Sequence, residues 1–174
     1  MEQQVEQNLR TEGLKKELSF RESMTAAFPI QGNVTLTLYD AAHGNRDTTA
    51  MFHLWRNLDA RICRNFLKLG NNWRQLVSRP RWVVVMEKNE TGHKHLHGMV
   101  AYENAPAWKA AFEAAFAEDW KLHGWTAQSD LVTDERGWVK YMMKTASVWA
   151  YDHDHFDFRV SPNCPQFRDL ETSQ

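Results

Sequence analysis

The sequence predicts an α+β fold in which one antiparallel sheet carries helices on one of its faces. Short segments rich in β-branched residues alternate with longer segments whose apolar residues recur at helical spacing. Two of the strand-like segments are separated only by a short turn, which indicates a hairpin within the sheet. The chain has 174 residues, of which 43% are hydrophobic, so one domain with its own core is expected.

The first strand is expected over residues 33–39, because polar and apolar residues alternate in the segment NVTLTLY. A helix is expected from Thr48 to about Leu69, since the apolar residues of this segment form one stripe at helical spacing. Two further strands are expected at 81–88, which contains WVVVM, and at 94–102.

The second half of the chain continues the alternation of helices and strands. A helix should begin at Pro106, because four aromatic residues follow it at intervals of four: Trp108, Phe112, Phe116 and Trp120. A fourth strand is expected near 126–132. A last helix is expected over 134–147, with Asp134 at its N-cap position.

This βαββαβ order is that of the ferredoxin-like or RRM-like plan, with helices on one face of the sheet and the other face open. Residues 1–28 carry little apolar periodicity and are interpreted as a tail or a peripheral helix. Residues 29–150 form the expected domain. Residues 151–174 are interpreted as an acidic C-terminal tail, which includes the solvated DHDH segment at 152–155.

The N-terminal segment is polar throughout and contains no apolar stretch of the kind found in secretory signals. No apolar run approaches the ~20 residues that span a membrane. Cys63 and Cys164 are far apart and match no metal-binding spacing, so reduced thiols are expected. We therefore expect an intracellular protein, cytoplasmic if bacterial, with no membrane partner.

The turn between the two middle strands determines which side chains meet across the hairpin. A three-residue loop over 90–92 ends in a glycine, which suits the left-handed position of such loops. This loop pairs Glu87 with His95, and His97 follows on the same face of its strand. A four-residue loop would shift the register and turn Glu87 to the other face.

One carboxylate and two imidazoles suit Mn²⁺ or Mg²⁺ and would also accept zinc or nickel. Open coordination positions on such an ion allow it to polarise a phosphate. Glu87 is the expected third ligand beside His95 and His97, and His93, on the same face, is the alternative. A polar strand face without a metal ion is the other interpretation of this pattern.

In the helix expected over 134–147, the apolar residues form one stripe, and Tyr141 and Lys144 project from nearly the opposite side. The two residues are three positions apart and therefore neighbours on the helix surface. Lys144 can stabilise negative charge on the phenolate or hold a phosphate oxygen. An ordinary solvated helix face would show the same pattern.

Three short blocks occur in a fixed order along the chain. They are VTLTL at 34–38, HLH at 95–97 with Glu87 upstream, and YMMK at 141–144. The set resembles the HUH endonucleases, specifically the single-tyrosine rolling-circle replication initiators of plasmids and single-stranded DNA viruses. A glutamate eight residues before the first histidine is similar to the virus-type metal triad. The resemblance covers about residues 30–147.

The resemblance implies an RRM-like nuclease that nicks and rejoins single-stranded DNA or an origin stem-loop at a specific site. Tyr141 would attack the scissile phosphodiester and leave a 5′-phosphotyrosine and a free 3′-OH, while Lys144 assists. The metal ion would be held by Glu87, His95 and His97. The first-motif strand would lie beside this centre, without a chemical role assigned to its threonines.

Substrate binding is expected to involve basic side chains, although the net charge is only −1. The acidic residues gather in the tails, so a neutral total can hide a basic face. Trp138, one turn before Tyr141, is the candidate for stacking on a base. The candidates for contacts with the DNA backbone are Arg61, Arg64, Lys68, Arg79 and Arg81.

Several alternatives stay open at this point. A single-tyrosine transposase shares the motif order, whereas relaxases usually place the nucleophile before the histidines. A non-catalytic origin-binding regulator would keep the fold, and a metal-dependent hydrolase would use activated water. No glycine-rich phosphate loop ending in Lys-Ser/Thr appears, so no helicase domain is expected within this sequence. The chain is then either a compact initiator whose partner is a host or separate helicase, or an excised nuclease domain.

Overall fold

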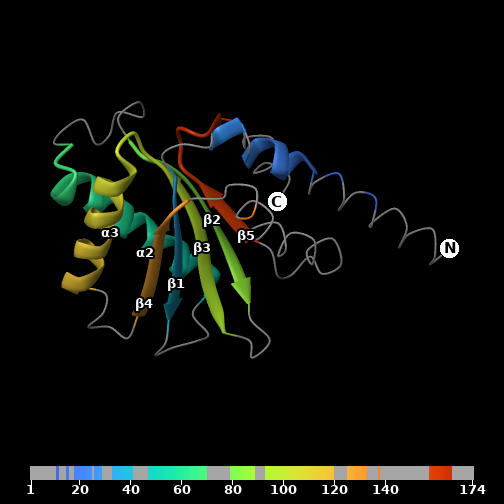
Figure 1. Ribbon diagram of the computed structural model, residues 1–174. Coiled ribbons are helices and arrows are strands. Elements are labelled where there is room, and N and C mark those ends of the chain that lie inside the picture. Colours follow the sequence, from blue (N-terminus) through green and yellow to red (C-terminus); the bar gives the residue numbers. More distant parts are fainter. Residues whose placement is uncertain are drawn as a thin grey trace.

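The computed structural model shows an α+β protein built on one five-stranded antiparallel sheet (Figure 1). It describes residues 11, 15, 18–24, 26–28, 33–40, 47–69, 79–88, 93–119, 125–132, 137 and 157–165. The strands are β1 (Asn33–Asp40), β2 (Arg81–Lys88), β3 (Lys94–Ala101), β4 (Trp125–Leu131) and β5 (Asp157–Val160). The helices with assigned bounds are α2 (Thr48–Arg61), the π-helical turn η1 (Ile62–Phe66) and α3 (Ala105–Asp119).

The strand order in the sheet is β4-β1-β3-β2-β5, and every neighbouring pair is antiparallel. From β1 to β4, strands and helices follow one another along the chain as βαββαβ. The predicted α+β class and the antiparallel sheet are confirmed. The four predicted strands lie within one residue of their observed bounds, because each one alternates or is bounded by turn residues.

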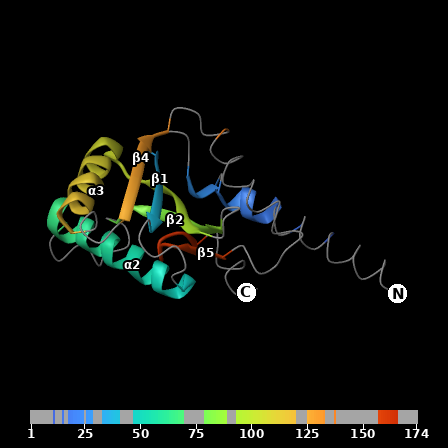
Figure 2. The same ribbon diagram turned by 90° about the horizontal axis from the view of Figure 1, so that it is seen from below.

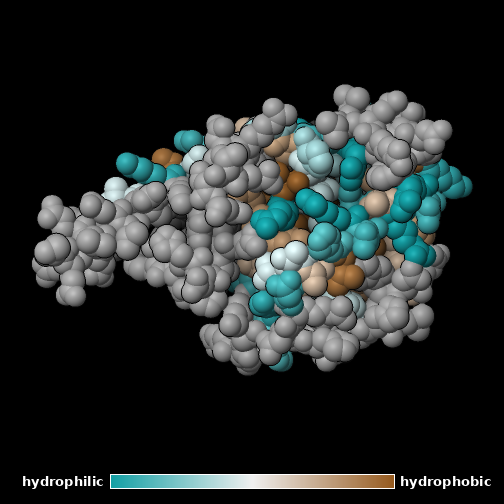
Figure 3. All heavy atoms as spheres, turned by 180° about the vertical axis from the view of Figure 1, so that it is seen from behind, coloured by the Kyte–Doolittle hydropathy of each residue, from teal (hydrophilic) through white to brown (hydrophobic). Residues whose placement is uncertain are grey.

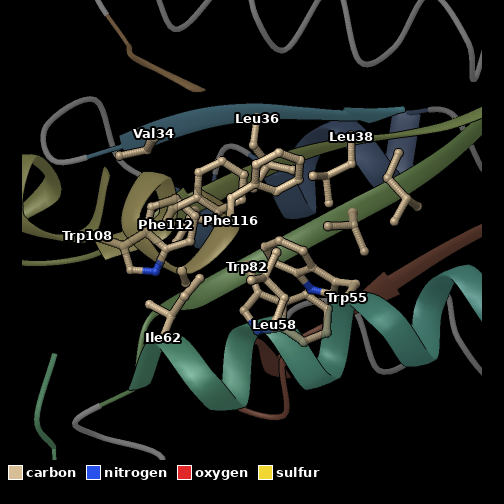
Figure 4. Packing of buried hydrophobic residues seen from close by; sticks show 14 of the residues in the cluster. Val34, Leu36, Leu38, Trp55, Leu58, Ile62, Trp82, Trp108, Phe112 and Phe116 are labelled. Carbon is tan, nitrogen blue, oxygen red and sulfur yellow. The ribbon is translucent and has the colours of Figure 1, made fainter. Parts of the chain in front are cut away.

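Helices α2 and α3 pack against the same face of the sheet (Figure 2). Their aromatic and aliphatic side chains meet those of β1 and β2 in one apolar core (Figure 4). The rings of Trp55 on α2 and Trp82 on β2 pack edge to face, with centroids 5.6 Å apart. On α3, Trp108, Phe112 and Phe116 point into this core, as their spacing of four residues predicts.

The helix predicted from Thr48 to about Leu69 changes its form near its end. The α-helical part ends at Arg61, and η1 follows it directly, with the Leu67 amide donating to the Ile62 carbonyl. Lys68 then adopts a positive φ of 53°, a conformation that stops a helix. The helical segment is therefore a little shorter than expected.

The second face of the sheet is not left fully open, which corrects the expectation from sequence. Residues 18–24 and 26–27 are helical, and Phe20 and Met24 in this segment are buried against the sheet. The Phe20 ring contacts the Phe158 ring edge to face at 5.1 Å. Buried side chains of this segment recur at helical spacing (20, 24, 27 and 28), so they form one apolar face. Figure 2 shows this helix on the side of the sheet opposite α2 and α3.

The segment 151–174, interpreted as an acidic tail, contributes a strand to the sheet, and this corrects the expected boundary at residue 150. Strand β5 pairs with β2, with Phe158 opposite Val85 and Val160 opposite Val83. The amide of Ser161 donates to the Trp82 carbonyl at 2.9 Å and extends the pairing. The segment forms a strand in spite of its acidic residues, because Phe158 and Val160 are buried with Phe20 and Met24 in a second apolar cluster on this face of the sheet. The DHDH segment at 152–155 lies outside the described residues.

Viewed from behind, hydrophilic side chains lie over much of the described surface, and hydrophobic ones reach it only in small areas between them (Figure 3). In the part of the chain that the structure describes, no helix combines the length and the apolar character needed to cross a membrane.

Candidate metal centre

The β2–β3 hairpin places Glu87 directly opposite His95, and Val85 opposite His97. This is the register that a three-residue loop predicts, although residues 89–92 themselves lie outside the described residues. Because side chains alternate along a strand, Glu87, His95 and His97 project from the same face of the sheet. The observed pairing of β2 with β3 thus confirms the predicted register.

The inward side of β3 explains why the histidines face away from α2 and α3. Leu96 and Val100 are buried in the core beneath those helices, and Gly98 lies between them. A Cβ atom at Gly98 would come within 2.9 Å of Val84 Cγ1 and 3.0 Å of Leu36 Cγ. The close approach of β1, β2 and β3 at this point fixes which side of β3 faces the core.

The three side chains meet around the Glu87 carboxylate. Its Oε2 atom lies 2.9 Å from His97 Nε2 and 3.3 Å from His95 Nε2. The two imidazole rings are nearly perpendicular, at 85°, with centroids 4.6 Å apart. Both histidines are buried, with side chains 8% and 5% exposed, whereas the Glu87 side chain is 26% exposed.

The donor set fits a single metal ion. The three ligand atoms lie within 4.8 Å of one another, and among the described residues this is the only group of histidine, cysteine and carboxylate side chains with such spacing. Ligand bonds of ~2.2 Å keep two ligands of one ion within ~4.4 Å. Small side-chain movements would therefore bring Glu87, His95 and His97 around one ion. His93, the alternative third ligand, is exposed and is not part of the group.

Strand β1 supplies two neighbours that the sequence interpretation did not assign. Thr37 lies opposite His97 in the β1–β3 register, and Tyr39 lies opposite His95. Thr37 Oγ1 is 3.0 Å from His97 Nδ1. The Tyr39 ring stacks on the His95 ring, with centroids 5.1 Å apart and planes 20° from parallel. The sequence shows that Thr37 and Tyr39 lie on the same face of their strand, but it does not show which residues of β3 they face.

No protein-family model matches this chain, and no curated protein matches it either.

The expected nucleophile cannot be placed beside the metal centre. Tyr141, Lys144 and Trp138 lie outside the described residues. Of the helix expected over 134–147, the structure describes Gly137 alone, in a helical conformation.

Among the basic candidates, Arg79 is mostly buried and forms an ion pair within the fold. It pairs with the carboxylate of Asp59, a residue of α2 that is 1% exposed, and its own side chain is 14% exposed. Burial raises the pKa of the Asp59 carboxyl, and the positive charge of Arg79 opposes this shift. Cys63, one turn further along, donates to Asp59 Oδ1 at 3.7 Å. The Arg79 guanidinium is therefore held by a buried carboxylate, and little of it is presented to solvent.

The other four basic candidates lie away from the metal centre. Arg81 begins β2, whereas Glu87 is six residues further along, which corresponds to ~20 Å of extended strand. Lys94 next to His95 donates to Thr48, so the start of α2 lies near the metal end of the sheet. The fourteen residues of α2 span ~21 Å. Arg61, Arg64 and Lys68 at and beyond its end are thus remote from the histidines.

Proposed function

We propose that this protein is a metal-dependent endonuclease that nicks and rejoins single-stranded DNA and initiates rolling-circle replication. The observation that carries the proposal is the convergence of Glu87, His95 and His97 on one face of the β2–β3 hairpin. The βαββαβ chain order and the β4-β1-β3-β2 arrangement support a ferredoxin-like or RRM-like nuclease domain, to which β5 is added.

Three residues of the chain would hold a Mn²⁺ or Mg²⁺ ion. Glu87 contributes the carboxylate that such ions favour, and the two imidazoles complete one side of the coordination shell. When bound, the ion supplies Lewis-acid polarisation of a phosphate oxygen. Since Glu87 is the most exposed of the three, substrate would approach from its side. The buried histidines keep their positions because the strands around them are fully paired.

In the proposed reaction, the phenolic oxygen of Tyr141 forms a bond to the phosphorus of the scissile phosphodiester. The bond between phosphorus and the 3′-oxygen breaks, and this oxygen leaves as a free 3′-OH with the proton that Tyr141 loses. The DNA then remains attached to Tyr141 through its 5′-phosphate. The energy of the broken bond is kept in the phosphotyrosine, so a later attack by a 3′-OH can rejoin the strand. By resemblance, Lys144 stabilises the charge that develops at this centre.

The test uses the intact chain, Mn²⁺ and end-labelled single strands that cover the origin of the replicon encoding it. On a denaturing gel we expect cleavage and a covalent protein–DNA adduct, both lost in Tyr141→Phe and in His95→Ala. Tyr151→Phe is the matched control, because Tyr151 lies outside the motif and should not change either product. Rejoining to a second strand with a free 3′-OH should release the adduct.

Other outcomes identify other functions. Cleavage without an adduct would indicate a hydrolase that uses activated water. An adduct formed only with the ends of a mobile element would indicate a transposase. If the cognate origin binds but is not cleaved by the metal-loaded protein, the chain is a non-catalytic regulator and the proposal is wrong.

A further inference from the structure

Thr37 makes a side-chain contact with one of the two histidines of the candidate metal centre. Its Oγ1 atom lies 3.0 Å from His97 Nδ1, on the side of the ring opposite the contact between Nε2 and Glu87. The two residues are cross-strand neighbours in the β1–β3 pairing, although 60 positions separate them in the sequence. The imidazole of His97 therefore has a polar neighbour beside each nitrogen: a hydrogen bond with Thr37 at Nδ1, and the Glu87 carboxylate 2.9 Å from Nε2.

The two nitrogens of a neutral imidazole have different roles, since one carries a proton and the other a lone pair. In the tautomer that carries the proton on Nε2, this nitrogen faces the Glu87 carboxylate 2.9 Å away, and Nδ1 has to accept a hydrogen bond. When Nε2 coordinates a metal ion, it has to offer its lone pair, and the proton must move to Nδ1, which then donates. The partner of Nδ1 thus has to accept in one state and donate in the other.

A hydroxyl group is suited to this partner position, because it can both donate and accept a hydrogen bond. A backbone carbonyl or a carboxylate at the same place could only accept, and it would therefore hold His97 in the metal-binding tautomer alone. We propose that Thr37 is a positioning residue that keeps the His97 ring in place while its proton moves from Nε2 to Nδ1 on metal binding. This inference rests on the metal site of the proposed function and is independent of Tyr141.

In the part of the chain that the structure describes, the other histidine, His95, has no hydrogen bond at its Nδ1 atom that corresponds to the contact of His97 with Thr37. Its Nδ1 atom is buried and has no hydrogen-bond partner among the described residues. The His95 ring is instead covered by the Tyr39 ring, which stacks on it and is itself 41% exposed. On its Nδ1 side, His95 is therefore held by packing alone, whereas His97 has a hydrogen bond there. The two rings should respond differently when the β1 hydroxyl is removed.

The same strand offers a matched control for that substitution. Thr35 lies two residues before Thr37 and faces the same side of the sheet, and its hydroxyl donates to the Asp130 carbonyl at 3.2 Å. Thr35 is 3% exposed and lies opposite Met99, not opposite a histidine. Thr35→Val therefore removes one hydroxyl from β1 and leaves the histidines untouched. Thr37→Ser keeps the hydroxyl of Thr37 and removes only its methyl group.

The first measurement is the affinity for Mn²⁺ by titration calorimetry, without DNA. In Thr37→Val we expect a dissociation constant about 10- to 100-fold higher, as for other outer-shell partners of metal-bound histidines. Thr37→Ser and Thr35→Val should stay close to the wild type. An affinity unchanged in Thr37→Val would overturn the inference. A wild-type chain that binds no Mn²⁺ would overturn the proposed metal site itself, so the two failures are distinguishable.

The second measurement is the ¹⁵N NMR spectrum of the histidine rings at pH 8, with Zn²⁺ as a diamagnetic probe. In the metal-free wild type we expect His97 to carry its proton on Nε2, and Zn²⁺ should move the proton to Nδ1. A ring that keeps its proton on the same nitrogen in both states would contradict the inference. This wild-type comparison decides the question even if Thr37→Val fails to fold.

Discussion

Gly98 occupies the point where three strands come closest together, and replacing it with alanine tests that packing. The added Cβ would lie 2.9 Å from Val84 Cγ1, and 3.0 Å and 3.1 Å from Leu36 Cγ and Cδ1. Contacts below 3.0 Å require something to move. Leu36 and Val84 are both buried in the core beneath α2 and α3, so neither side chain has free space to enter.

The expected cost of Gly98→Ala is about 1–3 kcal/mol of unfolding free energy, the range for an extra methyl group forced into a packed core. For a chain of this length, each kcal/mol lowers the melting temperature by ~2–4 °C. Val84→Ala alone removes two methyl groups and should cost about 2 kcal/mol. In the double variant the closest contact is gone, so the combined loss should be at least about 1 kcal/mol smaller than the sum.

Urea denaturation of the wild type, the two single variants and the double variant provides the four free energies of this cycle. Equal slopes across the four curves would show that the unfolded states are comparable. Two results would refute the reasoning: full stability of Gly98→Ala, or strictly additive losses in the double variant. Either one would mean that the three strands are not packed as closely at Gly98 as the structure has them.

Three further predictions follow from the described residues. Glu87→Ala and His95→Ala should weaken Mn²⁺ binding to a similar extent in calorimetry, whereas His93→Ala should not; the reverse order would exclude Glu87 as a ligand. Asp59→Ala should cost about 3–5 kcal/mol in urea denaturation, because the mostly buried Arg79 guanidinium loses its carboxylate partner. Replacing both partners with apolar residues should recover most of the loss. Burial, reinforced by the Asp59 charge, raises the pKa of the Cys63 thiol from 9.0 to about 12. Iodoacetamide at pH 8 should therefore alkylate Cys63 only after unfolding, and labelling of the folded chain, measured by mass spectrometry, would contradict the raised pKa. The free energy of unfolding should fall from pH 9 upwards, because only the thiol of the unfolded chain ionises there.

The metal cluster could be predicted from sequence because its geometry is local. Within a hairpin, the length of the loop determines every cross-strand pair. Because side chains alternate between the two faces of a strand, it also determines which side chains share a face of the sheet. A glycine at residue 92 favours the three-residue loop, and this loop places Glu87 opposite His95, as observed. The helix beginning at Thr48 was equally accessible, since its apolar stripe extends over several turns.

Features that depend on distant partners could not be derived in this way. The burial of Arg79 cannot be read from the sequence, because its partner Asp59 lies twenty residues earlier and on another element. The contact of Thr37 with His97 requires the β1–β3 register, which no short turn fixes. Strand β5 has only four residues in an acidic segment, too few for periodicity to indicate a strand. The N-terminal helix did carry a signal, the apolar spacing that begins at Phe20, but its short run was outweighed by polar neighbours.

The locality of the three ligands also has a consequence for the order in which the site forms during folding. Glu87, His95 and His97 fall within eleven residues, so bringing them together closes only a short loop, with a small entropic cost. Hairpins of this kind form in ~1–10 μs, well before strands that are distant in sequence find one another. Thr37, by contrast, meets His97 only after a loop of 60 residues has closed. We therefore expect an isolated hairpin to bind an ion weakly, and the docking of β1 to raise that affinity, so that metal retention would report on completed tertiary assembly.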